Sequence, residues 1–420
     1  MHAIEKILAR AAGKDRVRAG EIVTAAVDLA EINDLYLQVI QSFEAMGGKG
    51  VWDPDKVVFV FDHYSPPPTP KAADNHRVMR EFVAKEGIPH LFDIDAGVCH
   101  QVMPEGGLVR PGMVLVATDS HTTTHGAFGA FATGVGATDL AVVLIRGTLW
   151  FVVPEVVKIE LTGRLPQGTT AKDVVLGLLQ RFKADGFVYK AVEYAGPAVT
   201  DFSIAERMVI CNMAVEMGAK TTYIQPDDKL REYLAARGIE DYPIDTTDPD
   251  YEYAEVHQFD VGQVEPLLAA PHSVDNVHPV GDYAGTAIDQ AFIGTCTGGR
   301  LEDLEMAAKV LRGRRIPPGV RLVITPASKE VFLKAMATGC IKDLVEAGAT
   351  VTSPGCGPCL GIHQGMLGPG EVCITASSRN FPGRMGSPQA EIYVASPLTV
   401  AASALRGRIT DPREVLEEGS

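Results

Sequence analysis

The sequence predicts an α/β protein made of more than one domain. Short apolar runs typical of buried strands alternate with amphipathic segments typical of helices along the chain. Histidine, carboxylate, cysteine or arginine residues directly follow several of these runs. The chain has 420 residues, of which 46% are hydrophobic, and this suffices for two or three domains with their own cores.

The first expected domain covers residues 1–154 and ends where Pro154 precedes a new strand. A Gly-rich run at residues 126–136 lacks the phosphate-binding pattern G-x-x-x-x-G-K-[ST], so we interpret it as close packing. Apolar side chains recur at helical spacing in residues 2–12, 71–86 and 138–150, and continuous apolar runs predict strands at 21–28, 56–61, 90–94 and 113–117.

The second expected domain covers residues 155–280. It contains a predicted strand at 156–161 and a predicted helix at 170–180. Residues 207–217 are a buried segment, helix or strand, that carries Asn212 and Glu216. Residues 226–256 are polar and are interpreted as a surface excursion.

The third expected domain covers residues 281–420. Predicted strands lie at 288–293, 321–326, 371–376 and 391–395. Predicted helices lie at 301–311, at 328–336 with a Ser cap, and at 399–405, which we expect to be the last.

Reactive side chains follow strands in more than one of these domains. Asp62-His63, Asp119-Ser120-His121, Cys296 and Ser378-Arg379 each come after the C-terminal end of a predicted strand. Open α/β sheets bind ligands outside the carboxyl ends of their strands. We therefore expect several α/β units to present these loops to one shared centre.

Three cysteines in Gly-rich loops predict a metal centre. Cys356 and Cys359 form a C-x-x-C in T352-S-P-G-C-G-P-C-L-G361, and Cys296 lies in G294-T-C-T-G-G-R300. Thiolates favour zinc, copper(I) or Fe–S clusters, and structural zinc normally has four protein ligands. Three thiolates on a four-iron cluster would leave one iron open as a Lewis acid. A C-x-x-C alone also fits a zinc knuckle or a redox pair, whereas Cys340 and Cys373 are interpreted as buried hydrophobic side chains.

Composition excludes several functional classes. The net charge of −15 argues against nucleic acid and against anionic membranes as partners. No apolar run reaches the 18 residues of a membrane span, and residues 1–10 resemble a helix start rather than a signal peptide. Seven cysteines in a chain of this length do not form a secreted disulfide framework. We expect a reducing cytoplasm.

Several motifs, in a fixed order, resemble the aconitase superfamily. They are G294-T-C-T-G-G-R300, S353-P-G-C-G-P-C-L-G361 and S378-R-N-F-P-G-R-M-G386. The resemblance extends over nearly the whole chain and is closest to the large subunits of 3-isopropylmalate dehydratase and homoaconitase. It implies three α/β domains around a [4Fe-4S] cluster held by Cys296, Cys356 and Cys359, with one iron open to substrate.

The resemblance also assigns roles to individual residues. Asp62 and His63 match a pair that protonates the departing hydroxyl, and Asn212 matches an amide that hydrogen-bonds the cluster. His100 with Asp119, and His121 with Glu216, match two further acid–histidine pairs. Arg379 and Arg384, with the neighbouring Ser378, match the segment that binds substrate carboxylates, for which Arg is suited.

The resemblance implies a hydro-lyase that dehydrates and rehydrates a small hydroxy-diacid. The leading hypothesis is isomerisation of 2-isopropylmalate and 3-isopropylmalate through isopropylmaleate in leucine biosynthesis. The alternatives are a homoaconitase, a dimethylmalate-type dehydratase, an Fe–S sensor without catalysis, and a structural zinc protein. No segment for the family's swivelling domain follows residue 404, so we expect it, with the general base, on a separate small subunit.

Two positions depart from the family pattern. Gly298 replaces the Asn of the usual C-T-N-G-R, and Ser378 replaces the Asn that normally precedes Arg379. Hydrogen bonds to cluster sulfur tune stability and potential. The loss of two amide donors therefore bears on the properties of the cluster and on the substrate.

Overall fold

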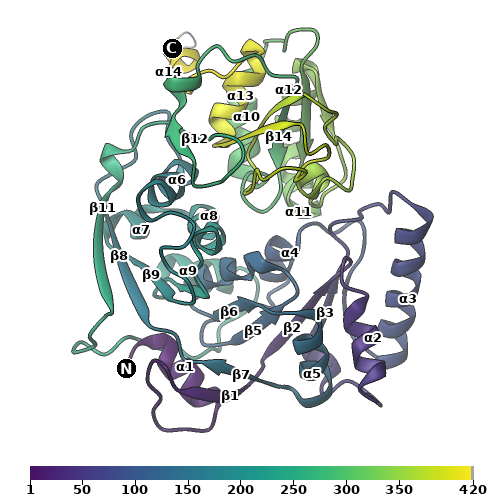
Figure 1. Ribbon diagram of the computed structural model, residues 1–420, viewed down its shortest axis with the longest axis vertical. Helices are drawn as coiled ribbons and strands as arrows, with labels where there is room; N and C mark the ends of the chain where they lie inside the picture. Colours follow the sequence, from purple (N-terminus) through teal and green to yellow (C-terminus); the bar gives the residue numbers. More distant parts are fainter. Residues whose placement is uncertain (418–420) are drawn as a thin grey trace.

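Three mainly parallel sheets carry the fold of this computed structural model, which describes residues 1–417. Figure 1 places the sheet that contains β14 at the top, the sheet of β2, β3 and β5 at the bottom, and β8 and β11 at the left. Each sheet draws its strands from one continuous part of the chain. Reactive loops meet between the upper and lower sheets.

The first sheet is fully parallel, with the order β4-β3-β2-β5-β6. Its strands are β2 Leu29–Asn33, β3 Val57–Val60, β4 His90–Phe92, β5 Val114–Ala117 and β6 Phe131–Gly134. The helices of this part are α1 Ala3–Ala11, α2 Gln38–Ala45, α3 Pro70–Glu86, α4 Cys99–Glu105 and α5 Ala137–Arg146, with 3-10 helices η1 Pro54–Lys56 and η2 Ser120–Phe128. A separate antiparallel ribbon pairs β1 Ile22–Ala26 with β7 Thr148–Val152.

The second sheet has the parallel order β10-β9-β8-β11. Its strands are β8 Val156–Thr162, β9 Ala191–Ala195, β10 Thr221–Tyr223 and β11 Glu255–Asp260. Its helices are α6 Ala171–Phe182, α7 Pro197–Asp201, α8 Ile204–Met213 and α9 Asp228–Ala235, with η3 Ala214–Met217 and η4 Val261–Gln263.

The third sheet has seven strands in the order β13-β12-β18-β17-β14-β15-β16. Its strands are β12 Leu267–Ala269, β13 Val277–Pro279, β14 Gln290–Gly294, β15 Arg321–Thr325, β16 Ala349–Val351, β17 Val372–Thr375 and β18 Glu391–Ala395. Its helices are α10 Leu301–Leu311, α11 Lys329–Ala337, α12 Cys340–Ala347, α13 Pro397–Arg406 and α14 Pro412–Glu417, with η5 Val280–Tyr283 and η6 Gly357–Leu360. β12 and β13 lie before residue 280 in the chain, yet they pair within this third sheet. The third sheet therefore begins before residue 280, where we expected the second domain to end.

Local sequence signals explain where the helices start. The hydroxyl of Ser203 accepts from the backbone N–H of Glu206, and the Glu206 carboxylate accepts from the backbone N–H of Ser203, which is a capping box at the start of α8. Thr170 and Asp173 do the same for α6. Thr69 caps α3, whose first residue is Pro70. These caps satisfy N–H groups that have no partner inside the helix.

Some expectations from the sequence were wrong. Residues 148–152 form β7 rather than the end of a helix, because α5 stops at Gly147 in the left-handed region and the chain then pairs with β1. The segment 226–256 lies largely at the surface, as expected, and it contains α9 and the start of β11. The Gly-rich run packs closely, as expected, because a Cβ at Gly126 would lie 2.1 Å from Thr222 Oγ1, and the run also includes β6. The expectation that α13 is the last helix was wrong, because α14 follows it. The buried segment 207–217 is helical, in α8 and η3.

Within residues 1–417, no helix is long and apolar enough to cross a membrane.

Candidate active site

The three loop cysteines lie in one buried cavity. Cys296 follows β14, whereas Cys356 and Cys359 follow β16, and each is less than one-tenth exposed. The cavity is also lined by Asp62, His63, Cys99, His100, Asp119, His121, Ser378 and Arg384. The sequence prediction that loops of separate sheets converge is therefore confirmed, because β3, β5, β14 and β17 all end at this cavity.

The C-x-x-C loop packs directly on the loop after β3. The backbone N–H of Cys356 donates to the carbonyl oxygen of Asp62 at 2.8 Å. A Cβ at Gly355 would lie 2.7 Å from the same oxygen, and the φ of Gly355 is +151°. Only glycine allows this approach without strain.

Two side chains donate hydrogen bonds to the cysteine sulfurs. Asn212 Nδ2 lies 3.3 Å from Cys296 Sγ, and Arg384 Nη2 lies 3.4 Å from Cys359 Sγ. Although burial lowers the pKa of Arg384, the neighbouring Cys359 raises it, and the net result is above its usual value. Such donors stabilise thiolate charge, so they suit sulfurs that act as metal ligands.

The residues fit a cluster better than a single ion. In the described part of the chain, Asp62, His63 and Cys356 are the one trio of histidine, cysteine and carboxylate ligand atoms that lie within 4.8 Å of one another. The sulfurs of Cys296, Cys356 and Cys359 share the cavity without forming such a compact trio. A cluster binds each sulfur to a different iron, so it spans sulfurs that one tetrahedral ion cannot. Burial raises the pKa of Cys296 to about 11 and that of Cys356 well above its usual value, so metal binding must displace their protons.

Asp62 and His63 form a tight buried pair. His63 Nδ1 lies 2.7 Å from Asp62 Oδ1, and Asp62 Oδ2 accepts from the backbone N–H of Cys99 at 3.0 Å. Asp34 accepts from the backbone N–H groups of His63 and Tyr64 at 3.1 and 2.8 Å. Burial lowers the pKa of His63, but Cys356 and Asp62 outweigh it and raise the pKa well above its usual value. His63 can therefore hold a proton for general acid work.

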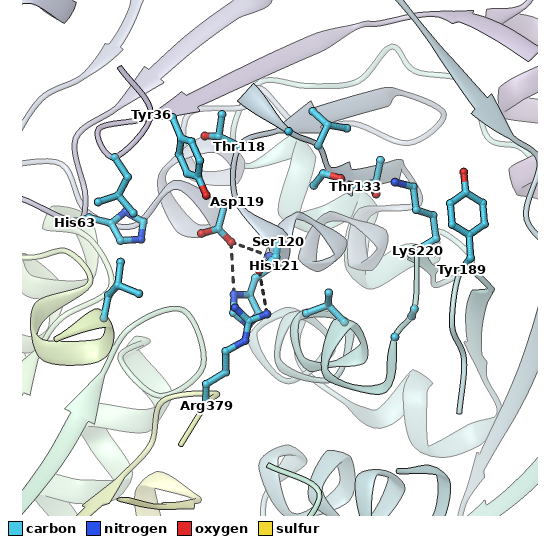
Figure 2. A pocket seen from close by; sticks show the side chains of 18 of the residues that line it. Tyr36, His63, Thr118, Asp119, Ser120, His121, Thr133, Tyr189, Lys220 and Arg379 are labelled. Atoms are coloured by element: carbon cyan, nitrogen blue, oxygen red, sulfur yellow. Dashed lines mark hydrogen bonds and ion pairs between the residues drawn. The ribbon is translucent and has the colours of Figure 1, made fainter. Parts of the chain in front are cut away.

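A second network joins the loop after β5 to the rest of the site. His100 Nε2 lies 3.0 Å from Asp119 Oδ1, which also accepts from the backbone N–H of His121 at 2.7 Å. His121 Nε2 and Arg379 Nε both lie 2.7 Å from Glu216 Oε1. Figure 2 shows Asp119, His121 and Arg379 together on one wall.

The carboxylates of this network are ionised. Burial acts to raise their pKa values, but the hydrogen bonds from His100 and His121 hold the pKa of Asp119 well below its usual range. Burial also acts to raise the pKa of Glu216. The interactions of its carboxylate with His121 and Arg379 outweigh burial and leave this pKa below its usual value. The network can therefore hold charge on both acids near neutral pH.

A larger cavity of about 620 Å³ adjoins this network. His63, Asp119, His121 and Arg379 line it on the site side, and Tyr189 and Lys220 line it on the other (Figure 2). Arg384 also lines this cavity. A cavity of this size accommodates a small diacid.

Gly298 and Ser378 take different places in the structure. Ser378 lines the cysteine cavity and is 2% exposed. A Cβ at Gly298 would lie only 2.3 Å from Cβ of Ala376 and 2.9 Å from its carbonyl oxygen. The loop after β14 is thus packed against the end of β17, with no room for a larger residue unless that contact shifts.

Two residues that support the site were missed from the sequence. Asp34 also binds His76 Nε2 at 3.0 Å, and it follows β2, a strand that was not predicted although its apolar run ends in an acid like the others. Lys172 donates to the carbonyl oxygens of Ala376 and Ser377 at 2.9 and 2.8 Å. No local pattern marked Lys172, because a lysine in a helix is normally exposed.

Comparisons with known proteins agree with this geometry. The sequence model of the aconitase family (aconitate hydratase) matches residues 36–286 and 281–407. The 3-isopropylmalate dehydratase large subunit 1 of Methanopyrus kandleri is 52% identical over 414 residues, which cover 98% of this chain and 99% of the relative. A probable methanogen homoaconitase large subunit of Methanothermobacter thermautotrophicus is 48% identical over 424 residues, covering 100% and 99%. The crystal structure of holo-form aconitase X from Thermococcus kodakaraensis shares the fold, with a TM-score of 0.51, 12% identity and coverage of 90% and 89%.

Proposed function

The chain belongs to the aconitase family, and from this premise we propose that it is the large subunit of a hydro-lyase that isomerises 2-isopropylmalate and 3-isopropylmalate. The observation that carries the proposal is the meeting of three buried cysteines with two acid–histidine networks in one cavity. Relatives over nearly the full chain carry the name of this dehydratase.

Cys296, Cys356 and Cys359 would hold a [4Fe-4S] cluster, with Asn212 and Arg384 as donors to two of the sulfurs. When bound, the cluster supplies a Lewis-acidic iron with one open position for the substrate's hydroxyl and carboxylate. The domains of the proposal are 1–154, 155–280 and 281–420, arranged around this site.

The residues of this chain supply the proton and the binding groups. His63, oriented by Asp62 through Nδ1, gives a proton to the departing hydroxyl from its other nitrogen. Arg379 and Arg384 bind substrate carboxylates from the wall of the larger cavity. Glu216 fixes the direction of Arg379, and Asp119 fixes both His100 and His121.

A small subunit completes the site in this proposal. The relatives are named large subunits, which implies a second chain. We assign to that chain the swivelling domain, the general base and much of the selection among diacids. A reducing cytoplasm suits a protein with seven free cysteines, three of which must stay available as ligands.

Homoaconitase is the second candidate, because a relative of that name is 48% identical over the whole chain. The two candidates share the residues described above and differ in the distal group of the substrate.

The test is anaerobic reconstitution with iron and sulfide, followed by iron counting and EPR after mild oxidation. We expect about four irons per chain and a three-iron signal as one iron is lost. Isopropylmalate and homocitrate are then assayed with the co-expressed small subunit. Zinc or no metal, with seven titratable thiols, would overturn the cluster, and turnover of homocitrate alone would select the second candidate.

A further inference from the structure

A second cavity of about 520 Å³ lies behind the site, where the three sheets' helices meet. It is bounded by α4, α8, α9, α10 and α11; α4, α8 and α9 occupy the middle of the molecule in Figure 1. Gln101, Tyr233, Arg237 and Arg300 line it. The assigned roles of the site residues do not use this cavity.

Helix α4 separates the two cavities. His100 on this helix lines the cysteine cavity, and its neighbour Gln101 lines the second one. Gln101 Oε1 accepts from Arg300 Nε at 2.9 Å, which holds the guanidinium beside α4. Arg300 is 2% exposed, and its Nη1 and Nη2 have no hydrogen-bond partner among the described residues.

A row of buried polar atoms continues from Arg300 to the active site. The buried atoms of this region that have no partner in the described chain include Arg300 Nη1 and Nη2, Tyr233 Oη, both ring nitrogens of His125, and His100 Nδ1. The ring centroids of His100 and His125 are 5.5 Å apart. The apolar ring of Phe128 packs against both His125 and Tyr233, with ring centroids 6.4 Å and 5.5 Å away. Unpaired buried polar atoms are rare, so their gathering on both sides of Phe128 calls for partners that the side chains do not supply.

Water is the partner that this row fits. His100 Nε2 is engaged by Asp119, which leaves Nδ1 to bond elsewhere, yet no bond joins it directly to His125. A buried water typically takes about three polar partners, and the row supplies donors and acceptors in turn. Burial and the charges of His100 and Arg300 hold the pKa of His125 well below its usual value, so the neutral ring has one donor and one acceptor.

An anion at Arg300 fits less well. The cavity wall also carries Glu105, Asp201, Glu206, Glu232, Glu302 and Glu330, which outnumber its cationic side chains. These carboxylates would repel a second anion at the mouth.

We propose that His125 is a positioning residue in a buried water path that links the second cavity to the His100–Asp119 pair. The path's role rests on the proposed hydro-lyase function, which must exchange water and protons with solvent while substrate fills the larger cavity. A proton that reaches one nitrogen of His125 is matched by one that leaves the other, so the ring returns to its neutral form.

The first test needs no activity. A high-resolution crystal structure of the protein would place ordered water within hydrogen-bond distance of His100 Nδ1 and of both His125 nitrogens. Water-free apolar density there, or direct protein bonds to both rings, would overturn the path whatever the enzyme's substrate is.

The second test uses the cluster-loaded chain with its small subunit. We expect His125→Phe to lower kcat about tenfold with an unchanged KM and a larger solvent deuterium isotope effect, and His125→Gln to restore most of the rate because it keeps a donor and an acceptor. Tyr233→Phe should give a smaller loss of the same kind. Tyr194→Phe is the matched control, since its hydroxyl is also buried and unpartnered but belongs to β9, away from the row.

Wild-type kcat and isotope effect in His125→Phe would overturn the role of His125. If Tyr233→Phe and Tyr194→Phe change kcat and the isotope effect equally, the water path does not extend to the second cavity. If the loaded complex turns over neither diacid, the proposed function fails, whereas the crystallographic test still decides whether the water path exists.

Discussion

Asn212 donates from Nδ2 to Sγ of Cys296 at 3.3 Å, although the two residues are 84 positions apart. The same nitrogen donates to Thr124 Oγ1 at 2.7 Å, so the amide is held between two loops. A side chain of α8 thus donates to a sulfur after β14, and this bond lowers the pKa of Cys296 against the larger effect of burial. The chemistry of the proposed cluster is set partly by a different sheet from the one that carries its ligands.

Asn212→Leu should make the reconstituted cluster less stable in air. The variant removes the donor to Cys296 while it keeps a side chain of similar volume, and loss of such support typically costs about tenfold in metal affinity. The half-life of the cluster absorbance in air, with iron per chain at each time, measures the effect.

Thr124→Val is the control for Asn212, because it removes the second acceptor and leaves the sulfur bond. Its cluster should decay close to the wild-type rate. Equal half-lives for Asn212→Leu and the wild type would contradict the importance of this bond.

Gly298→Ala should destabilise the protein by about 1–3 kcal/mol, because its Cβ would overlap Ala376. The thermal unfolding midpoint of the apo protein measures this. The double variant Gly298→Ala with Ala376→Gly removes the side-chain overlap and should recover part of the loss. An unchanged midpoint in the single variant would show that the contact is not as tight as the geometry indicates.

Ionised Glu216 should stabilise the folded protein at pH values above the pKa of the unfolded state, and this stabilisation should be lost in acid. Its folded pKa is below 4.5, so the stabilisation is present above about pH 4.5 and disappears as pH falls through the lowered value. Glu216→Gln should therefore cost about 2–4 kcal/mol near pH 7 and progressively less below pH 4.

Unfolding free energies of wild type and Glu216→Gln across pH 7 to 3.5 test this. Glu346→Gln serves as the reference, because Glu346 forms an exposed helix pair with Lys342. A gap between wild type and Glu216→Gln that stays constant with pH would refute the assignment.

Lys172→Met should loosen the segment before Arg379. The lysine is 1% exposed, and its removal leaves the carbonyl oxygen of Ser377 without this donor and that of Ala376 with the hydroxyl of Thr297, at a cost of about 2–3 kcal/mol. Chemical denaturation measures the loss, and limited proteolysis should cut the loosened segment sooner.

Lys229→Met is the matched comparison for Lys172. Lys229 also donates to backbone carbonyls, those of Thr200, Asp201 and Phe202, but near the surface, where water can replace it. Lys229→Met should lower the free energy of unfolding by well under half as much as Lys172→Met. Equal losses in the two variants would show that burial is not the reason for the effect of Lys172.

Short-range signals explain what could be predicted. The strand ends before Asp62, Asp119 and Cys296 were readable because an apolar run followed by a polar residue is a local pattern. β2 escaped the same reasoning, and with it Asp34. β7 was taken for helix because apolar residues continue past Gly147, and only pairing with β1 makes them a strand.

The sequence by itself determined which three loop cysteines are candidate soft ligands, the reactive loops at strand ends and the α/β class, since each depends on residue type and on spacing within a few positions. Only the tertiary structure decided that Asn212 reaches Cys296, that Lys172 bonds to residues 376–377, and that the ring of His125 packs against that of His100. Those contacts join residues tens to hundreds of positions apart or depend on how loops pack. Their geometry arises when the sheets and helices fold against each other, and no local pattern encodes it.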